Sequence, residues 1–427
     1  MRTYTHSGAE DDGRSTGARG LSRRGMLGLL GAGGAGLALG GIGGATAASA
    51  VVRGERAARS HPFHGAHQQG VTTPAPDALV LASLDMVEGA TVDDLRELLA
   101  DWTYAASRLS QGLEVAEDGA AGTSPEAPPP DSGEALGLDA AGLTITIGVG
   151  PSLFDDRFGL EDRRPTALVD LPLFAGDLLE AARCGGDLCI QACAADSQVA
   201  LHAVRNLMRI AFGRAQVRWL QTGFTHAEGS AERAMTPRNL LGFKDGSANL
   251  RVDDPEHLAE HVWVGDDDQA WLAGGTYLVA RRIRMTVESW DRTRLREQER
   301  VIGRTKLEGA PLTGGAERDD VDLDATDDTG QPAMDANAHV RLAHPSVTGT
   351  RILRRPFNYV DGVTSVGQLD AGLVFLSFQR DPEQFVTIQR SMRTDLLNEY
   401  IRHVGSAVFA ILPGIAEGES LGDRLLA

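Results

Sequence analysis

Residues 187–224 read DLCIQACAADSQVALHAVRNLMRIAFGRAQVRWLQTGF, and their pattern decides the fold. The stretch begins with an apolar run at 187–194 that is typical of a buried strand. Apolar residues then recur at helical spacing over 196–212, where Asp196 can cap the helix. A second strand pattern follows at 216–224. The stretch therefore predicts a strand, a helix and another strand joined by short turns.

Segments of the same kinds precede this stretch and recur after it. Upstream lie a strand pattern at 79–87, a helical pattern at 91–109 and a strand pattern at 143–148. Together with 187–224 they give the order β-α-β-β-α-β. After Leu250 the same order returns, with the second and fifth segments helical, at 275–285, 286–302, 351–359, 372–379, 382–404 and 407–412.

The repeated order predicts an α+β fold made of two ferredoxin-like halves, each an antiparallel sheet with helices on one face. We place the first half at 71–249 and the second at 250–427, after an N-terminal extension at 51–70. Two long acidic segments rich in Gly or Pro, at 112–142 and 307–338, interrupt the pattern. Such insertions usually lie at the surface.

The composition excludes several kinds of partner. The chain has 427 residues, of which 42% are hydrophobic, enough for a substantial core. Its 41 basic and 59 acidic residues give a formal net charge of −18, which argues against binding to nucleic acid or anionic lipid. Cys184, Cys189 and Cys193 match no zinc or disulfide framework, and no CxxCH motif is present for covalent haem attachment.

Residues 1–50 have the features of an export signal. Arg23 and Arg24 precede a weakly hydrophobic run of Gly, Ala and Leu, and small residues follow at 45–50. This pattern predicts a twin-arginine signal peptide, recognised by the twin-arginine translocase, and a mature protein that is extracellular, cell-wall associated or periplasmic. Because this route carries proteins that fold before export, often around a cofactor, we expect a cofactor. We expect no stable membrane insertion after the signal is removed.

The segment between the halves carries the first candidate for chemistry. It reads GFKDGSAN at 242–249 and places Asp245 among glycines that permit a tight turn. By itself this pattern suits either a carboxylate presented to a cavity or an ordinary surface turn. Three more motifs follow. The only two lysines of the chain, Lys244 and Lys306, both lie within these four motifs. The later motifs are VIGRTK at 301–306, HVRLAHP at 339–345 and RILRRPF at 351–357.

Taken together and in this order, the four motifs resemble those of the dye-decolourising peroxidases, haem enzymes of the dimeric α+β barrel class. The resemblance extends from GAHQQG at 65–70 to LPG at 412–414. It is closest to the exported subgroup that includes the deferrochelatase/peroxidase of bacterial iron uptake. The resemblance implies that the two halves form one barrel within the chain and that each chain binds one haem b without a covalent bond. An oligomer is compatible with it.

The resemblance makes His339 the proximal ligand of the haem iron. A carboxylate that is hydrogen-bonded to the other ring nitrogen would increase the basicity of the imidazole. We assign that carboxylate to Asp395 on the last predicted helix, with Asp370 as the alternative. Arg304 resembles the residue that pairs with a haem propionate, a use that suits a planar bidentate donor. A helix C-terminal cap is the other interpretation of Arg304.

On the opposite, distal face the resemblance makes Asp245 and Arg354 the catalytic residues. Hydrogen peroxide must lose a proton from one oxygen and gain one on the other before the O–O bond splits, and an ionised carboxylate can carry that proton. Arg354 would stabilise the developing negative charge and favour the ionised form of Asp245. Arg355 should face the other way and serve the structure, because side chains alternate along a strand.

Several other residues keep two interpretations each. Phe375 and Phe378 line the haem cavity or belong to the core. Trp219, Trp290 and Tyr359 are surface relays for electrons or simply pack. Three histidines lie near the expected mature N-terminus, namely His61, His64 and His67. They either bind a metal or serve the structure, and the structural role is favoured.

The sequence thus predicts an exported haem peroxidase that reduces hydrogen peroxide and oxidises dyes, phenolics or other one-electron donors. Release of iron from haem with the porphyrin intact is a related alternative. A haem carrier without catalysis is another, and a structural module without haem is a third. A carrier needs an iron ligand but no proton shuttle, so the presence of both Asp245 and Arg354 favours the enzyme.

Overall fold

The computed structural model describes residues 60–226, 236–266 and 268–427. The predicted signal peptide at 1–50 and the start of the extension at 51–59 lie outside the described residues. In the described part, nine strands form one sheet in the order β5-β9-β2-β3-β1-β4-β7-β8-β6. A further pairing of β5 with β8 closes this sheet into a barrel in which all paired strands are antiparallel.

The first half has the predicted β-α-β-β-α-β order. Its strands pair in the sequence β2-β3-β1-β4, which is the ferredoxin-like arrangement. Thr91 and Asp94 form a capping box at the start of the first helix, and Asp196 caps the second. The elements are β1 (Ala78–Met86), α3 (Val92–Leu109), β2 (Thr144–Val149), β3 (Leu188–Ala194), α4 (Ser197–Ile210) and β4 (Ala215–Phe224).

The second half repeats the arrangement with the strand order β7-β8-β5-β9. Two of its strands, β6 and β7, are one strand interrupted at Pro356, since both pair with β8 in the same register. The elements are β5 (Thr276–Met285), α6 (Val287–Trp290), α7 (Leu295–Ile302), β6 (Leu353–Arg354), β7 (Phe357–Val363), β8 (Leu369–Gln379), α10 (Pro382–Ser391) and β9 (Ile401–Ile411).

Short helices occupy the connections. Three are α-helical, namely α5 (Pro255–His261), α8 (His339–Leu342) and α9 (Pro345–Thr348). The 3₁₀ turns are Pro151–Phe154, Glu161–Arg163, Ala181–Arg183, Ala270–Leu272, Met392–Thr394 and Leu396–Glu399. No helix in the described part of the chain is both long enough and apolar enough to span a membrane.

Two seams join the halves into a single barrel. At one, Gly148 of β2 pairs with Ile411 of β9, and at the other Phe224 of β4 pairs with Asn358 of β7. Gln68 of the extension reinforces the first seam, because its Nε2 donates to the carbonyl oxygens of Ile147 at 2.7 Å and Leu412 at 2.8 Å. The predicted α+β fold, with two halves forming one barrel in one chain, is confirmed.

Two predicted helices are wrong in their extent. The helix expected at 286–302 is broken between α6 and α7, and the helix expected at 382–404 ends at Ser391. Residues 401–404 belong instead to β9, where Ile401 pairs with Met285 and Arg402 with Arg284. Long-range strand pairing here outweighs a local spacing of apolar residues that fits a helix.

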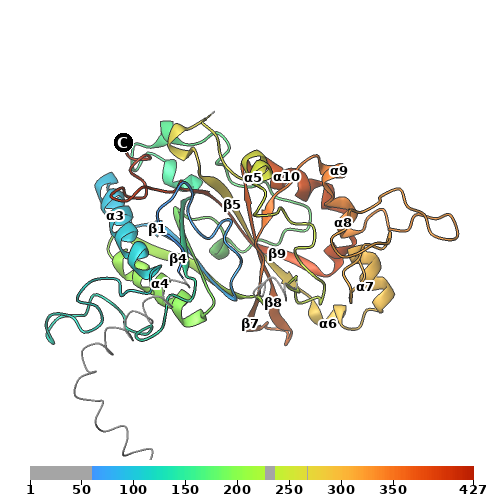
Figure 1. Ribbon diagram of the computed structural model, residues 1–427, viewed down its shortest axis with the longest axis horizontal. Helices are drawn as coiled ribbons and strands as arrows, with labels where there is room; N and C mark the ends of the chain where they lie inside the picture. The colour runs from blue at the N-terminus through green and yellow to red at the C-terminus, as the bar shows by residue number, and fades with distance from the viewer. Residues whose placement is uncertain (1–59, 227–235, 267) are drawn as a thin grey trace, which may run out of the picture. The chain divides into compact units, whose positions relative to one another are not determined.

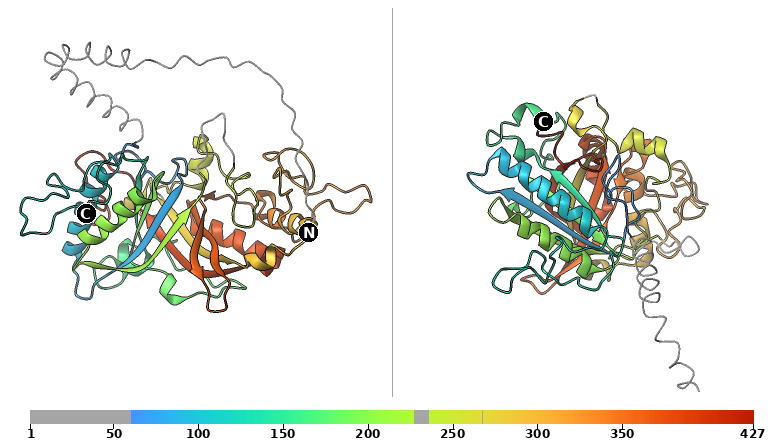
Figure 2. Two further views of the ribbon diagram at one scale, coloured as in Figure 1. Left: turned by 90° about the horizontal axis from the view of Figure 1, so that it is seen from below. Right: turned by 60° about the vertical axis from the view of Figure 1, so that its left-hand side comes forward.

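The barrel interior and the outer face of the first half form two packed layers. Alternate residues of the strands, among them Leu79, Cys189, Cys193 and Phe409, are buried inside the barrel. On the outer face of the first half, α3 and α4 lie side by side across the strands (Figure 2). Trp102 at the centre of that layer is fully buried. In Figure 1 these two helices cover one side of the barrel, while α7, α8 and α10 lie on the other.

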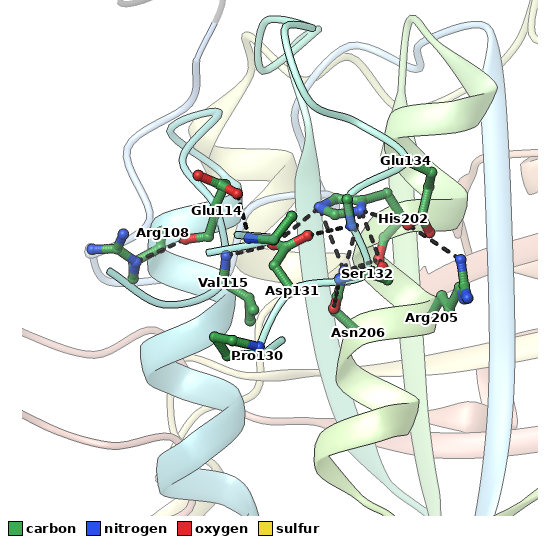
Figure 3. Close-up of polar contacts among 12 residues, drawn as sticks. Arg108, Glu114, Val115, Pro130, Asp131, Ser132, Glu134, His202, Arg205 and Asn206 are labelled. Atoms are coloured by element: carbon green, nitrogen blue, oxygen red, sulfur yellow. Dashed lines mark hydrogen bonds and ion pairs between the residues drawn. The ribbon is translucent and has the colours of Figure 1, made fainter. Parts of the chain in front are cut away.

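The insertion at 112–142 is held against α4 by a buried polar network (Figure 3). Asp131 accepts a hydrogen bond from the backbone N–H of Val115 at 2.8 Å, and Asn206 donates to the hydroxyl of Ser132 at 2.8 Å. His202 of α4 lies between the carboxylates of Asp131 and Glu134, at 3.5 and 3.4 Å. This network anchors the insertion on α4, while most of residues 121–130 are exposed.

Candidate functional site

A cavity of about 770 Å³ lies on the outer face of the second half's sheet. Apolar side chains of β5 and β8 form one of its walls, among them Ile283, Met285, Leu373 and Phe375. Phe378 does not reach it, because this side chain points into the barrel and is fully buried. The five residues proposed from the sequence all line this one cavity, and they are Asp245, Arg304, His339, Arg354 and Asp395.

His339 and Asp395 form a hydrogen-bonded pair on one side of the cavity. Nδ1 of His339 lies 2.6 Å from Oδ2 of Asp395, and the other carboxylate oxygen accepts from the backbone N–H of Leu397 at 2.8 Å. The His339 side chain is 31% exposed, whereas that of Asp395 is 3% exposed. Because Nδ1 is engaged, Nε2 is the ring nitrogen left for a ligand.

Asn337 holds the two segments that carry this pair together. Its carbonyl oxygen accepts from the N–H of Leu396 at 3.1 Å, and its side-chain oxygen accepts from the hydroxyl of Thr394 at 2.8 Å. Asp395 itself lies between two 3₁₀ turns, so its expected position on a long helix is wrong. This carboxylate is positioned beside His339 by tertiary contacts of a non-helical segment. A periodic sequence pattern does not reveal such contacts.

The electrostatics of the pair favour a hydrogen bond between imidazole and carboxylate. Burial would lower the pKa of His339, but the charge and hydrogen bond of Asp395 outweigh it and raise that pKa above its ordinary value. The charges of Arg354 and Asp245 also act on His339, so the second pair of residues lies within electrostatic range of the first.

Asp245 and Arg354 form that second pair. Nη1 of Arg354 donates to Oδ1 of Asp245 at 2.8 Å, with side-chain exposures of 27% and 12%. Asn249 fixes the strand that carries the arginine, since its side chain accepts from the Arg354 N–H at 2.8 Å and donates to the Arg354 carbonyl oxygen at 2.7 Å. Asn249 lies within the motif at 242–249, but its position in the sequence does not indicate this role.

Neighbouring arginines on this strand have different partners, as strand alternation favours, although both contribute atoms to the cavity lining. Arg355 is 5% exposed and donates to the carbonyl oxygens of Thr73 and Pro74 in the N-terminal segment. Burial lowers the pKa of its guanidinium, and the thiol of Cys193 in the barrel interior lies nearby. These contacts support the structural role expected for Arg355.

Arg304 follows Gly303, the left-handed residue that ends α7, so Gly303 rather than Arg304 is the helix cap. The Arg304 side chain is buried, and its Nη1 donates to the carbonyl oxygens of Gly309 at 2.8 Å and Glu317 at 2.6 Å. Burial lowers the pKa of its guanidinium. No carboxylate is hydrogen-bonded to it within the described residues, which leaves it suited to an acidic group in the cavity.

The remaining candidates lie elsewhere. Asp370 does not pair with His339 but with Arg282 and Arg284 at 3.0 and 3.2 Å. Trp290 and Tyr359 are buried, so neither is a surface residue. Sequence analysis missed His403 of β9, which lines the cavity. Burial and the nearby charge of Arg281 lower the pKa of His403 to about 3.

The three N-terminal histidines do not converge. Nδ1 of His67 donates to the carbonyl oxygen of Gly274 at 2.7 Å, and the ring stacks on Trp263 with ring centroids 3.6 Å apart. Across the described parts of the chain, no group of three His, Cys, Asp or Glu side chains is arranged to hold a metal ion. These contacts support a structural role for His67.

Two family models match this chain. The model described as Dyp-type peroxidase, N-terminal, matches residues 68–225, and the one described as Dyp-type peroxidase, C-terminal, matches residues 236–416. The chain belongs to the Dyp-type peroxidase family. Members of this family are haem peroxidases that reduce hydrogen peroxide, and this chain is therefore an enzyme of that kind.

Individual relatives agree with this membership. This chain is 39% identical over 375 residues to the deferrochelatase of Escherichia coli K12, and the alignment covers 86% of this chain and 87% of that protein. Ferric DtpA from Streptomyces lividans is 40% identical with a TM-score of 0.79, covering 86% of this chain and 97% of that one. A Dyp-type peroxidase from Cellulomonas bogoriensis is 41% identical with a TM-score of 0.78, covering 86% and 98%.

The residues of the cavity fit a haem. The space is large, one wall is apolar, and an imidazole nitrogen is available beside a carboxylate-bound ring, a common arrangement for metal-ligating histidine. Arg304 supplies a buried positive charge suited to a propionate, and Asp245 with Arg354 supplies groups that can move a proton and stabilise an anion.

Proposed function

We propose that the chain is a peroxidase that binds one non-covalent haem b, with His339 as iron ligand and Asp245 and Arg354 as catalytic residues. The observation that carries this proposal is that the His339–Asp395 and Asp245–Arg354 pairs line one cavity. When bound, the haem supplies the redox chemistry that reduces hydrogen peroxide and oxidises dyes, phenolics or other one-electron donors.

On the ligand side, the residues hold and orient the imidazole. Asp395 holds the proton on Nδ1 of His339, which fixes the tautomer and directs Nε2 into the cavity for iron. Because Asp395 is itself anchored by the N–H of Leu397, the carboxylate stays in the position from which it restricts rotation of the ring. Arg304 would pair with a propionate and so help to hold the haem in the cavity.

On the other side, the residues move a proton and stabilise charge. The ionised carboxylate of Asp245 accepts a proton from one oxygen of hydrogen peroxide and returns it to the other. The guanidinium of Arg354 would donate hydrogen bonds to the peroxide anion and stabilise the negative charge that develops on the far oxygen until the proton reaches it. Their own hydrogen bond at 2.8 Å holds both groups in place before peroxide arrives.

Absorption spectroscopy tests the proposal. Protein loaded with haem should contain one haem b per chain by the pyridine haemochrome assay, and it should decolourise an anthraquinone dye only when hydrogen peroxide is added. Loss of dye colour without haem, or haem of another type, would contradict the proposal.

Release of iron from haem is the second candidate, because the chain is 39% identical to a protein named deferrochelatase. The two activities differ in their products. Peroxidase turnover leaves haem iron in the protein, whereas iron release yields free protoporphyrin, which fluoresces. Fluorescence of extracted porphyrin after incubation without peroxide therefore separates them.

We also propose that residues 1–50 direct export through the twin-arginine translocase, as Arg23 and Arg24 suggest. Changing both to lysine should leave the full-length protein inside the cell, while the unchanged chain appears outside the cytoplasm in a shortened form. Mass spectrometry of the two cell fractions measures this. Export of the double lysine variant at the normal level would contradict the proposal.

A further inference from the structure

Glu317, in the insertion at 307–338, contacts the turn at 242–249 that carries Asp245, here called the distal turn. Its contacts lie on both sides of Asp245. Its carboxylate accepts hydrogen bonds from Nζ of Lys244 and from the hydroxyl of Ser247, the latter at 3.1 Å. It also accepts from the hydroxyl of Thr236, which lies just before the turn. Residues far apart in the sequence are thus joined at one carboxylate, which itself does not touch Asp245.

The two lysines pack reciprocally across the same boundary. A Cβ placed on Gly309 of the insertion would lie 2.8 Å from Cδ of Lys244, and a Cβ placed on Gly242 of the turn would lie 2.7 Å from Cε of Lys306. Both glycines have positive φ, +76° and +84°, a conformation that other residues rarely adopt. Each lysine stem therefore occupies the space that a glycine leaves open on the other segment.

Backbone contacts of Glu317 and hydrogen bonds from Arg238 join the insertion, the turn and the cavity. The carbonyl oxygen of Glu317 accepts from Arg304, and the next residues, 318–321, line the cavity. Arg238 donates to the carbonyl oxygens of Gly242 at 2.8 Å and Lys306 at 2.6 Å. The insertion is consequently part of the cavity wall.

The carboxylate of Glu317 is well satisfied in this position. Its side chain is 19% exposed and that of Lys244 is 20% exposed, so solvent screens their charges less than at an open surface. Burial would raise the pKa of Glu317, but the hydrogen bonds from Lys244, Thr236 and Ser247 outweigh it and lower that pKa. Glu317 is therefore ionised at neutral pH and bound on three sides.

We propose that Glu317 is a positioning residue for the peroxidase reaction, holding the turn that presents Asp245 to the cavity. This inference rests on the catalytic role proposed for Asp245. A turn closed by two glycines is free to change shape, and a carboxylate that must accept and return a proton tolerates little displacement. The insertion supplies the contacts that restrict the turn, so it contributes to catalysis without touching peroxide.

The matched variants are Glu317→Gln and Glu308→Gln. Both remove one carboxylate from the same insertion, but the Glu308 side chain is exposed, whereas that of Glu317 accepts the hydrogen bonds from the turn. Two quantities are measured on the full chain. One is hydrogen exchange of the amides in residues 236–249, with and without haem, and the other is the rate at which the haem spectrum changes after peroxide is added.

In Glu317→Gln we expect faster amide exchange across 236–249, in both haem states, and a peroxide rate about tenfold lower. The rate loss should disappear when Glu317→Gln is combined with Asp245→Asn, because a residue acting through Asp245 has nothing further to lose. Glu308→Gln should match the unchanged protein in both measurements. Lys244→Gln, which removes one of the same hydrogen bonds, should reproduce the exchange result if Glu317→Gln does not fold.

Two outcomes would overturn the inference: unchanged exchange across 236–249, or the same fold-loss of rate in the presence and absence of Asp245. Failure of the proposed function looks different, because Asp245→Asn alone would then leave the peroxide rate unchanged. The single and double variants together therefore separate the two.

Discussion

The two halves of the barrel share strand order and pairing but differ in what covers their sheets. In the first half, α3 and α4 have 18 and 14 residues and pack along the strands. In the second, the corresponding helix is broken into α6 and α7, of four and eight residues, and α10 has ten. The face left open between these shorter helices is the cavity.

This difference shows where the function of the molecule resides. The same β-α-β-β-α-β unit serves as a closed packed layer in one half and as the wall of a reaction site in the other, so the topology alone specifies neither. Asp395 lies just beyond the early end of α10, and His339 and Glu317 lie in the long connection between α7 and β6. If the comparison is correct, matched changes in the helices that cover the two sheets should affect haem chemistry only in the second half.

The largest effect is expected for His339→Ala. Removing the imidazole removes the proposed iron ligand, so the variant should lose most of its haem and with it the peroxidase activity. The ratio of haem absorbance to protein absorbance measures the loss. His344→Ala is the matched change, five residues away, and should retain haem. The opposite pattern would move the ligand role to His344.

Next in size is the effect of the distal pair. Asp245→Asn and Arg354→Leu should both retain haem, but the reaction with peroxide should slow by about 10²- to 10⁴-fold because proton transfer or charge stabilisation is lost. Stopped-flow absorbance measures the rate. Normal rates in both variants would remove these residues from the mechanism.

Two buried tryptophans give a matched test of the halves. Trp102 and Trp290 are both fully buried, and each indole N–H donates to a backbone carbonyl oxygen, that of Leu207 or Leu241. Either change to Ala should lower the free energy of unfolding by about 3–5 kcal/mol, measured by denaturant titration. Only Trp290→Ala should also slow the peroxide reaction, because Trp290 packs on Phe243 of the distal turn. Equal effects of both on catalysis would contradict the comparison.

The smallest effect concerns pH. Burial and Arg281 lower the pKa of His403 to about 3, while Asp177, 3.8 Å away, is already ion-paired with Arg281. The unfolded chain binds a proton at this position below about pH 6.5 and the folded chain does not, so stability falls as pH drops from there towards 3, by up to about 1.4 kcal/mol per pH unit.

His403→Gln removes the titrating group. Its free energy of unfolding should therefore vary less between pH 6.5 and 4 than that of the unchanged protein, as measured by urea titration at several pH values. An identical slope in the two proteins would show that other groups control the acid sensitivity.

Much of the fold was predictable because the sequence of each segment indicates its secondary structure. Alternation and helical spacing identify the strands and most helices, and Thr91 and Asp196 mark helix starts. The start of β9 was not predictable, since residues 401–404 keep a helical spacing and become a strand only by pairing with β5. The break between α6 and α7 carries no glycine or proline that would signal it.

The site divides in the same way. Asp245, His339 and Arg354 lie in short motifs that the sequence displays, and alternation correctly separates Arg354 from Arg355. Glu317 lies in an insertion without periodicity, and its partners are 70 to 81 residues away in the chain. Contacts of that kind depend on tertiary structure, so sequence patterns do not reveal them.

A crystal structure of the haem-loaded protein would show where the haem binds and which residue ligates the iron. We expect electron density for one haem in the cavity of the second half, with Nε2 of His339 bound to iron and Asp245 and Arg354 on the other face of the porphyrin. A haem bound elsewhere, or an iron ligated by a residue other than His339, would contradict it.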